Sequence, residues 1–269
     1  MRLPMIPERF LSTTGIHNLR DYGGYRTADG GRVRRALLWR SGHHAEATPG
    51  DLEAVAALNL AQVVDFRGKS ERVRNACRRH ADFAARIHAY DGETASLAPH
   101  LEAADTALDA AGAHAAMLRI YAGLPDREPV LWVMRRYFDT LARDPGPKAG
   151  SEASLVHCHA GKDRTGMAVY LLHHLLGVHP DDAMEDYLLT NHAPNNEARI
   201  ASGFDSVKEH FNAVDEETVR VLMGVDPRYI EAMKHAVETR YGSLDAFLED
   251  ELQVDADKRA ALRLRLVEQ

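Results

Sequence analysis

The chain has 269 residues, of which 45% are hydrophobic and 27% are charged, and its net charge is −7. This globular balance excludes a disordered chain or a coiled-coil rod, and no apolar stretch is long enough to cross a bilayer. An acidic chain is a poor partner for nucleic acid. The two cysteines and the lack of a recognisable secretory signal predict a cytoplasmic protein, or one exported without such a signal.

The first half of the chain alternates between predicted strands and helices. Gly30-Gly31 predicts a hairpin, with residues 36–40 as its return strand. Thr48 as N-cap and Pro49 at the first helical position predict a helix to about residue 58. Two short apolar runs predict buried strands, at residues 61–66 and 85–90.

The second half is predicted to be mainly helical. Residues 92–128 are Ala-rich and weakly patterned, so we expect a loosely packed helical lid there. A buried strand is predicted at 154–158. Further helices are predicted at residues 130–142, 165–176 and 180–190, and over most of the remainder. Together these elements predict one α/β domain over residues 1–269, with a central sheet, flanking helices and a helical C-terminal part.

The most informative segment is HCHAGKDRTG, in which five residues separate Cys158 from Arg164. A tight loop between a strand and a helix directs several backbone N–H groups into one concavity, and the helix N-terminus adds partial positive charge. Arg164 adds a planar fork that grips two phosphate oxygens at once. The same donors stabilise a thiolate at Cys158, which is the nucleophilic form of cysteine. The segment therefore predicts a phosphate cradle with a nucleophile at its floor.

This loop resembles the Cys-X5-Arg signature of the protein tyrosine phosphatase superfamily. Four further segments look like the bacterial tyrosine/serine phosphatases that include secreted mycobacterial and listerial enzymes: NLRDYGGYRTADGGRVRRALLWRS (18–41), VVDFRGKSE (63–71), DYLLTN (186–191) and YGSL (241–244).

The resemblance implies a phosphatase-like fold and a two-step reaction through a phosphocysteine. Cys158 would be the nucleophile, and Thr165 would donate a hydrogen bond to its thiolate. His157 would anchor the loop. The phosphate would be bound by the residues that follow Cys158, namely His159, Ala160, Gly161, Lys162, Asp163 and Arg164. No metal or cofactor is implied, because Arg164 and the backbone N–H groups supply the charge stabilisation.

Three aspartates compete for the role of general acid. Asp91 follows the predicted strand 85–90, where the resembled family carries its acid loop, and is the first choice. Asp163 lies inside the cradle and is the second choice, since a carboxylate so close to the thiolate would oppose its ionisation. Asp65 ends a predicted strand and is followed by Arg67, so we expect it to cap a loop or to pair with an arginine instead.

The substrate class is open at this point. A phosphorylated protein is the first expectation. Lys162 occupies a position that is basic in phosphoinositide phosphatases of the superfamily, and it would contact a second phosphate on an inositol ring; the alternative is a solvated loop lysine. A basic cluster is expected to be either a solvated helix face or a docking patch for an acidic substrate or lipid headgroup, and it comprises Arg72, Arg74, Arg78, Arg79 and His80.

Several other functions compete with a protein phosphatase. One is a dedicated phosphoinositide or inositol phosphate phosphatase, and another is a phosphate-dependent binding module without turnover. A rhodanese-like sulfur carrier does not need Gly161, Arg164 and Thr165 in this order. A metal site at His157, Cys158 and His159 lacks a second ligand pair. An inert buried Cys158 would leave the loop composition unexplained.

Overall fold

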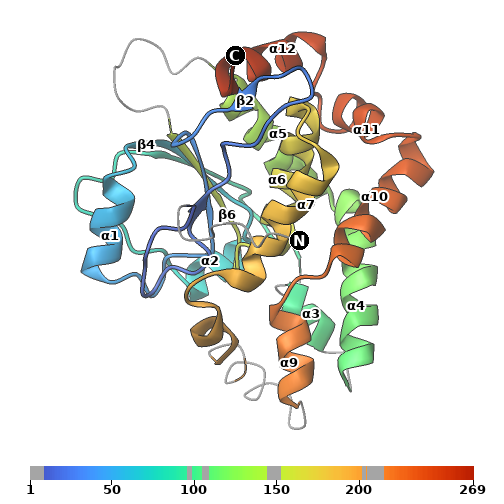
Figure 1. Ribbon diagram of the computed structural model, residues 1–269. Coiled ribbons are helices and arrows are strands. Elements are labelled where there is room, and N and C mark those ends of the chain that lie inside the picture. Colours follow the sequence, from blue (N-terminus) through green and yellow to red (C-terminus); the bar gives the residue numbers. More distant parts are fainter. Residues whose placement is uncertain (1–8, 96–98, 105–108, 144–152, 202–203, 205–214) are drawn as a thin grey trace.

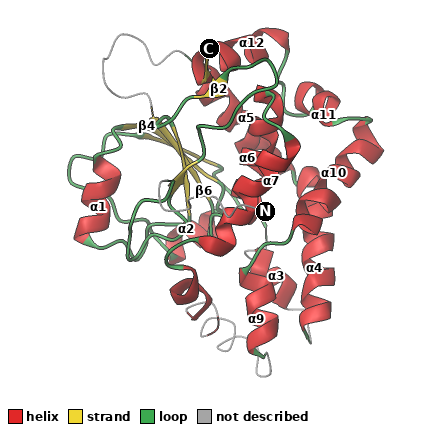
Figure 2. Cartoon of the chain, in the orientation of Figure 1, coloured by secondary structure: helices red, strands yellow, loops and turns green. Residues whose placement is uncertain are grey.

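The computed structural model describes residues 9–95, 99–104, 109–143, 153–201, 204 and 215–269, and its centre is a five-stranded sheet (Figures 1 and 2). The strand order is β1-β3-β6-β4-β5. β3, β6, β4 and β5 run parallel, and β1 is an antiparallel edge strand. The strand bounds are β1 Arg20–Asp21, β3 Leu38–Ser41, β4 Leu60–Asp65, β5 Arg86–Ala89 and β6 Ala153–His157. This confirms the predicted α/β class.

Helices cover both faces of the sheet. Val63 and Leu155, which are register partners on β4 and β6, face a smaller core under α1 (Pro49–Ala56). Their neighbours Val64 and Val156 face the main core, which also contains side chains of α5 (Glu128–Ala142) and α6 (Asp163–Leu176). Alternate side chains of a strand point to opposite faces, so each central strand supplies both cores.

The C-terminal part is helical, as expected, and lies on the α6 side (Figure 1). α10 packs along α4, and α12 packs on α5. A short strand, β7 (Val267–Glu268), closes this part by pairing with β2 (Arg32–Val33). The remaining helices are α2 (Lys69–Arg74), α3 (Pro99–Ala104), α4 (Ala110–Gly123), α7 (Pro180–Leu188), α9 (Glu216–Met223), α10 (Pro227–Tyr241), α11 (Leu244–Asp250) and α12 (Ala256–Leu266), with 3-10 turns at Leu124–Asp126 and Leu189–His192.

Two predicted helix boundaries are confirmed at the level of their caps. Thr48 Oγ1 accepts a hydrogen bond from Asp51 N at 3.2 Å, and Asp51 Oδ2 accepts one from Thr48 N at 2.9 Å, which forms a capping box at the start of α1. α6 ends at Gly177, whose φ of 80° is in the left-handed region that favours glycine.

The predicted return strand at residues 36–40 is wrong. A turn does form at Gly30, whose N–H bonds Thr27 O at 3.0 Å, but the chain returns through a bridge between Arg26 and Arg32. The four residues Leu38–Ser41 form β3 instead, inside the main sheet between β1 and β6. All four are buried, and that burial requires a central strand rather than an exposed hairpin arm.

The segment 92–128 contributes to the main core. Met117 and Tyr121 of α4 are fully buried there, as is Ala103 of α3. Residues 96–98 and 105–108 of this segment lie outside the described residues. Its role as a lid stays a prediction. Among the described helices, no helix is long and apolar enough to cross a membrane.

Candidate active site

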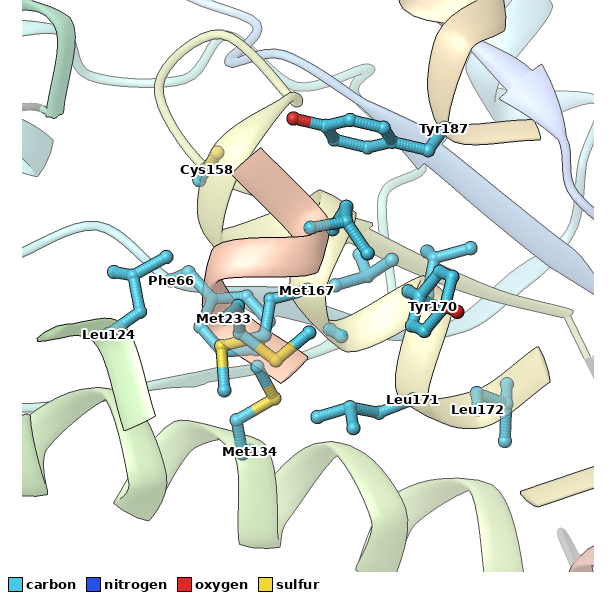
Figure 3. Packing of buried hydrophobic residues seen from close by; sticks show 14 of the residues in the cluster. Phe66, Leu124, Met134, Cys158, Met167, Tyr170, Leu171, Leu172, Tyr187 and Met233 are labelled. Atoms are coloured by element: carbon cyan, nitrogen blue, oxygen red, sulfur yellow. The ribbon is translucent and has the colours of Figure 1, made fainter. Parts of the chain in front are cut away.

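The predicted cradle lies at the end of β6, where Cys158 follows the strand and α6 begins at Asp163. Cys158 is 1% exposed and belongs to the main core, which also contains Phe66, Met167 and Tyr187 (Figure 3). The first N–H groups of α6 have no partners within the helix, and the helix dipole places partial positive charge there. The local geometry is therefore that of an anion-binding loop.

Arg164, in the first turn of α6, is held on two sides. Its Nη1 and Nη2 donate to the two carboxylate oxygens of Glu71 at 2.7 and 2.8 Å. Nη1 also donates to Phe66 O and Thr94 Oγ1, both at 3.0 Å. The Nε atom is buried and has no hydrogen-bond partner among the described residues. The guanidinium is thus fixed in place with one buried donor unused, as a phosphate-binding arginine requires.

The charges of Glu71 and Arg164 support each other. Burial is the largest single effect on Glu71 and disfavours its ionised carboxylate, but the charge and hydrogen bonds of Arg164 together with the Gly68 N–H outweigh burial and lower the pKa of Glu71 to about 2. Burial likewise disfavours the Arg164 cation, and the charge and hydrogen bonds of Glu71, with the charges of Cys158 and Asp163, outweigh it and raise the pKa of Arg164. Both groups are therefore ionised at neutral pH.

The loop backbone is tied to the N-terminal segment and to α7. Gly161 has a φ of 68°, and its carbonyl accepts hydrogen bonds from Asn18 Nδ2 at 2.9 Å and Arg40 Nη2 at 3.0 Å. Arg40 Nη1 pairs with Asp186 at 2.7 Å, and Arg20 pairs with the same carboxylate at 3.3 Å. All these charged side chains are fully buried. The loop conformation therefore depends on a polar network at its back.

The histidines around the loop pack against one another. His157 Nδ1 lies 3.3 Å from Cys158 O, and its ring stacks on His44 with centroids 5.6 Å apart. Burial lowers the pKa of His157 to about 3, so this ring is neutral at neutral pH. His159 contacts the His43 ring edge-on at 4.7 Å, and its carbonyl accepts the His43 N–H at 2.9 Å.

The cradle's own lysine and aspartate form a buried pair. Lys162 Nζ donates to Asp163 Oδ1 at 2.8 Å, and Tyr121 OH donates to the same oxygen at 2.8 Å. Tyr187 OH in turn donates to Tyr121 OH at 2.7 Å. Lys162 is 0% exposed, so the alternative interpretation as a solvated loop lysine is wrong. Burial lowers the pKa of Lys162, and the charge of Asp163 partly offsets this effect.

The other candidate acids lie in different surroundings. Asp91 follows β5, its carboxylate lies 3.1 Å from Lys69 Nζ, and its side chain is 88% exposed. The same loop reaches the site through Thr94, which contacts Arg164. Asp65 is buried and forms a bidentate pair with Arg67, which confirms the expected arginine partner.

Thr165 and Ala160 are also buried in the cradle. The Thr165 hydroxyl has no hydrogen-bond partner among the described residues. Over the same residues no cluster of three or more His, Cys, Asp or Glu side chains is arranged to hold a metal ion.

Several residues that organise the site were not identified from the sequence, chiefly Glu71, Asp186, Asn18 and Tyr121. Glu71 and Asp186 lie in the segments VVDFRGKSE and DYLLTN that carry the resemblance. That position was the one available signal, because local sequence does not reveal which distant charge an acidic residue will meet.

The fold and the loop together are those of a tyrosine phosphatase. The model of the tyrosine phosphatase family matches residues 11–268, and the chain belongs to that family. It is a hydrolase of the protein tyrosine phosphatase type, as expected from the sequence.

Two relatives cover most of its length. A Cupriavidus necator protein, named provisionally as a tyrosine-protein phosphatase, is 35% identical over 252 residues, which span 89% of this chain and 83% of the relative. The triple specificity protein phosphatase PtpB of Mycobacterium tuberculosis is 26% identical over 269 residues, which span 88% of this chain and 91% of the relative.

Proposed function

We propose that this chain hydrolyses phosphomonoesters through a phosphocysteine intermediate at Cys158. The observation that carries the proposal is the fixed guanidinium of Arg164. Its terminal nitrogens are held by Glu71, while its buried Nε has no hydrogen-bond partner among the residues that the structure describes. A buried donor without a partner is costly unless a ligand satisfies it. The adjacent start of α6 offers further N–H donors to the same anion.

In the first step Cys158 Sγ attacks phosphorus, the S–P bond forms, and the bond from phosphorus to the ester oxygen breaks. A carboxylic acid gives its proton to the leaving oxygen, and Asp91 is the first candidate for this acid. In the second step water attacks phosphorus and the S–P bond breaks. The water proton returns to the carboxylate, and Thr165 donates to the departing thiolate. Arg164 and the loop N–H groups stabilise the charge on the phosphoryl oxygens in both steps.

Asp163 has a different role in this proposal. Its carboxylate already accepts hydrogen bonds from Lys162 and Tyr121, so it braces the cradle. Asp91 is solvent-exposed on the loop that also carries Thr94, a direct neighbour of Arg164. In this proposal a movement of that loop brings a protonated Asp91 to the leaving oxygen, whereas moving Asp163 would break its buried pair with Lys162.

The proposed substrates are phosphotyrosine, phosphoserine or phosphothreonine in proteins, and phosphoinositides. The breadth is supported by the relative PtpB, whose name describes triple specificity. A dedicated phosphoinositide phosphatase is the alternative, and it differs by a strong preference for inositol lipids over phosphopeptides. Comparing kcat/KM across phosphotyrosine peptides, phosphoserine peptides and phosphoinositides separates the two.

The mechanism is tested by following hydrolysis of an aryl phosphate and trapping the intermediate by rapid acid quench. We expect the phosphoryl group on the peptide that contains Cys158, and we expect Cys158→Ser to abolish turnover while still binding vanadate. Cys77→Ser is the matched control, because Cys77 Sγ accepts hydrogen bonds from Arg67 and His44 outside the cradle. Near-normal hydrolysis by Cys158→Ser would show that the nucleophile is elsewhere.

A further inference from the structure

Five arginines are buried among the described residues, and one of them differs from the rest. Four lie within 4 Å of a carboxylate: Arg20 and Arg40 with Asp186, Arg67 with Asp65, and Arg164 with Glu71. Arg199 is only 3% exposed, yet it has no carboxylate at that distance among the described residues. An unpaired buried cation is costly, so its presence calls for a counter-charge that the described residues do not provide.

The hydrogen bonds of Arg199 are also incomplete. Its Nη2 donates to Asn196 Oδ1 at 2.6 Å, within the helical residues 196–201. Its Nε and Nη1 are buried, and neither has a partner among the described residues. Burial lowers the pKa of Arg199 to about 10, so the side chain remains a cation at neutral pH. Two buried N–H-bearing nitrogens on a cation are therefore available to an anion.

Two hydrogen bonds place the segment that carries Arg199 near the cradle. Asn195 Nδ2, four residues before Arg199, donates to Ile16 O at 2.9 Å, and Asn18 Nδ2 donates to the Gly161 carbonyl of the cradle at 2.9 Å.

The charge of Asp163 partly offsets the effect of burial on Arg199, and the charge of Arg199 adds to burial in lowering the pKa of Lys162. Arg199 also adds to burial in lowering the pKa of His17, whose Nδ1 is a further buried atom without a partner among the described residues. Asp163 is not the missing partner, because its carboxylate pairs with Lys162 at 2.8 Å and forms no ion pair with Arg199 within 4 Å.

We propose that Arg199, with His17 beside it, forms a second anion subsite that binds another phosphate group on the same substrate molecule. This inference rests on the proposed function, and it adds a residue that distinguishes bis-phosphorylated from mono-phosphorylated substrates. Burial of Arg199 does not argue against contact with a substrate. Cys158, the proposed nucleophile, must also contact the substrate, and it is buried to a similar degree.

A compact ring that carries two phosphates fits this arrangement better than an acidic peptide. Both anion sites are buried, and Arg199 interacts electrostatically with Lys162 and Asp163 of the cradle, so we expect the two phosphates to be joined by a short linker. A peptide carboxylate next to a phosphotyrosine is carried on a separate, flexible side chain, and ordering that side chain costs binding free energy. The proposed ligand is therefore the headgroup of a phosphoinositide, with its second phosphate on Arg199.

The test compares soluble inhibitors of aryl phosphate hydrolysis by the full chain, namely inorganic phosphate, an inositol monophosphate and an inositol bisphosphate with neighbouring phosphates. In Arg199→Met we expect the inhibition constant of the bisphosphate to rise roughly 10- to 100-fold, as loss of hydrogen bonds to a charged group implies. For inorganic phosphate and the monophosphate, the factor by which the inhibition constant rises should be at least ten times smaller than for the bisphosphate. Equal losses for all three anions would overturn the proposal.

Arg220→Met is the matched control. Arg220 is 45% exposed and already pairs with Glu197 and Glu216, so its loss should leave all three inhibition constants unchanged. Thermal unfolding gives a second readout. Arg199→Met removes an unpaired buried charge and should not lower the Tm, whereas a merely structural arginine would destabilise the chain when replaced. A marked fall in Tm without ligand would count against the subsite.

Two further measurements distinguish a failure of the subsite from a failure of the proposed function. Phosphotyrosine peptides with and without a neighbouring glutamate replace the inositol phosphates; a selective loss for the acidic peptide in Arg199→Met would overturn the inositol assignment in favour of a peptide. Calorimetric binding of the bisphosphate does not need turnover. If aryl phosphate hydrolysis is absent but the bisphosphate binds wild type more tightly than Arg199→Met, the proposed function fails and the subsite stands. Equal binding to both proteins would refute the subsite.

Discussion

Replacing Glu71 by Gln should weaken both the stability and the activity of the enzyme, because Glu71 is the carboxylate that fixes Arg164. The pKa of Glu71 falls from 4.5 to about 2 in the folded chain. At 1.36 kcal/mol per pKa unit, this shift corresponds to about 3 kcal/mol of stability at neutral pH. Since the folded pKa is depressed, this contribution is complete above the unfolded pKa and is lost as the pH falls toward the folded value. Roughly 1 kcal/mol should remain at pH 3.

Urea unfolding at pH 7 and pH 3 measures this difference between wild type and Glu71→Gln. The gap in unfolding free energy should shrink from about 3 to about 1 kcal/mol. Glu53→Gln, at an exposed position on α1, should show no such gap at either pH. At neutral pH the value of kcat/KM for an aryl phosphate should fall on the order of 100-fold in Glu71→Gln, because a misplaced Arg164 no longer aligns the phosphate. A stability gap that is equal at both pH values would refute the ion pair as its source.

Four further substitutions test individual parts of the site. Gly161→Ala should cost more than 1 kcal/mol of unfolding free energy and most of the activity, because an added Cβ would lie 2.3 Å from Ser41 O at a φ of +68°; wild-type activity would show that the loop can relax. Arg164→Lys should lower kcat/KM at least 100-fold, since a point charge cannot replace a bidentate fork; a milder loss would point to the backbone as the main phosphate ligand. Asp91→Asn should slow poor leaving groups far more than good ones, while Asp163→Asn should slow all substrates alike; the opposite result in a leaving-group series would reverse the two roles.

The sequence was most informative where function depends on adjacent residues. The strand, loop and helix around Cys158 were predictable because their signals are local: a short apolar run, a loop with glycine, and a helix that ends at Gly177. The cap at Thr48 was predictable for the same reason. β3 was misplaced because its role depends on partners far away in sequence, with β1 on one side and β6 on the other.

Within the site, the residue types were predictable but their partners were not. Lys162 was predicted to contact a second phosphate, with a solvated loop lysine as the alternative, and its buried pairing with Asp163 was not foreseen. Glu71 meets Arg164 only because β4 and β6 are neighbours in the sheet, so that the segment after β4 lies beside the cradle. A single sequence contains no direct signal for such a pairing. The exposed ion pair between Asp91 and Lys69 was likewise not predictable from the sequence. The assignment of Asp91 as the general acid stays a prediction.

The two hydrogen bonds to the Gly161 carbonyl mean that the loop sequence alone does not determine the conformation of the cradle. One donor, Asn18, precedes the loop by 143 positions, and the other, Arg40, is itself held by Asp186 on the far side of the loop in sequence. Grafting the ten-residue motif onto another strand and helix would transfer the phosphate donors without these restraints. During refolding, catalytic activity should return only after this long-range closure, since contacts of high sequence separation form late. Recovered turnover would then report completion of the whole fold rather than formation of α6.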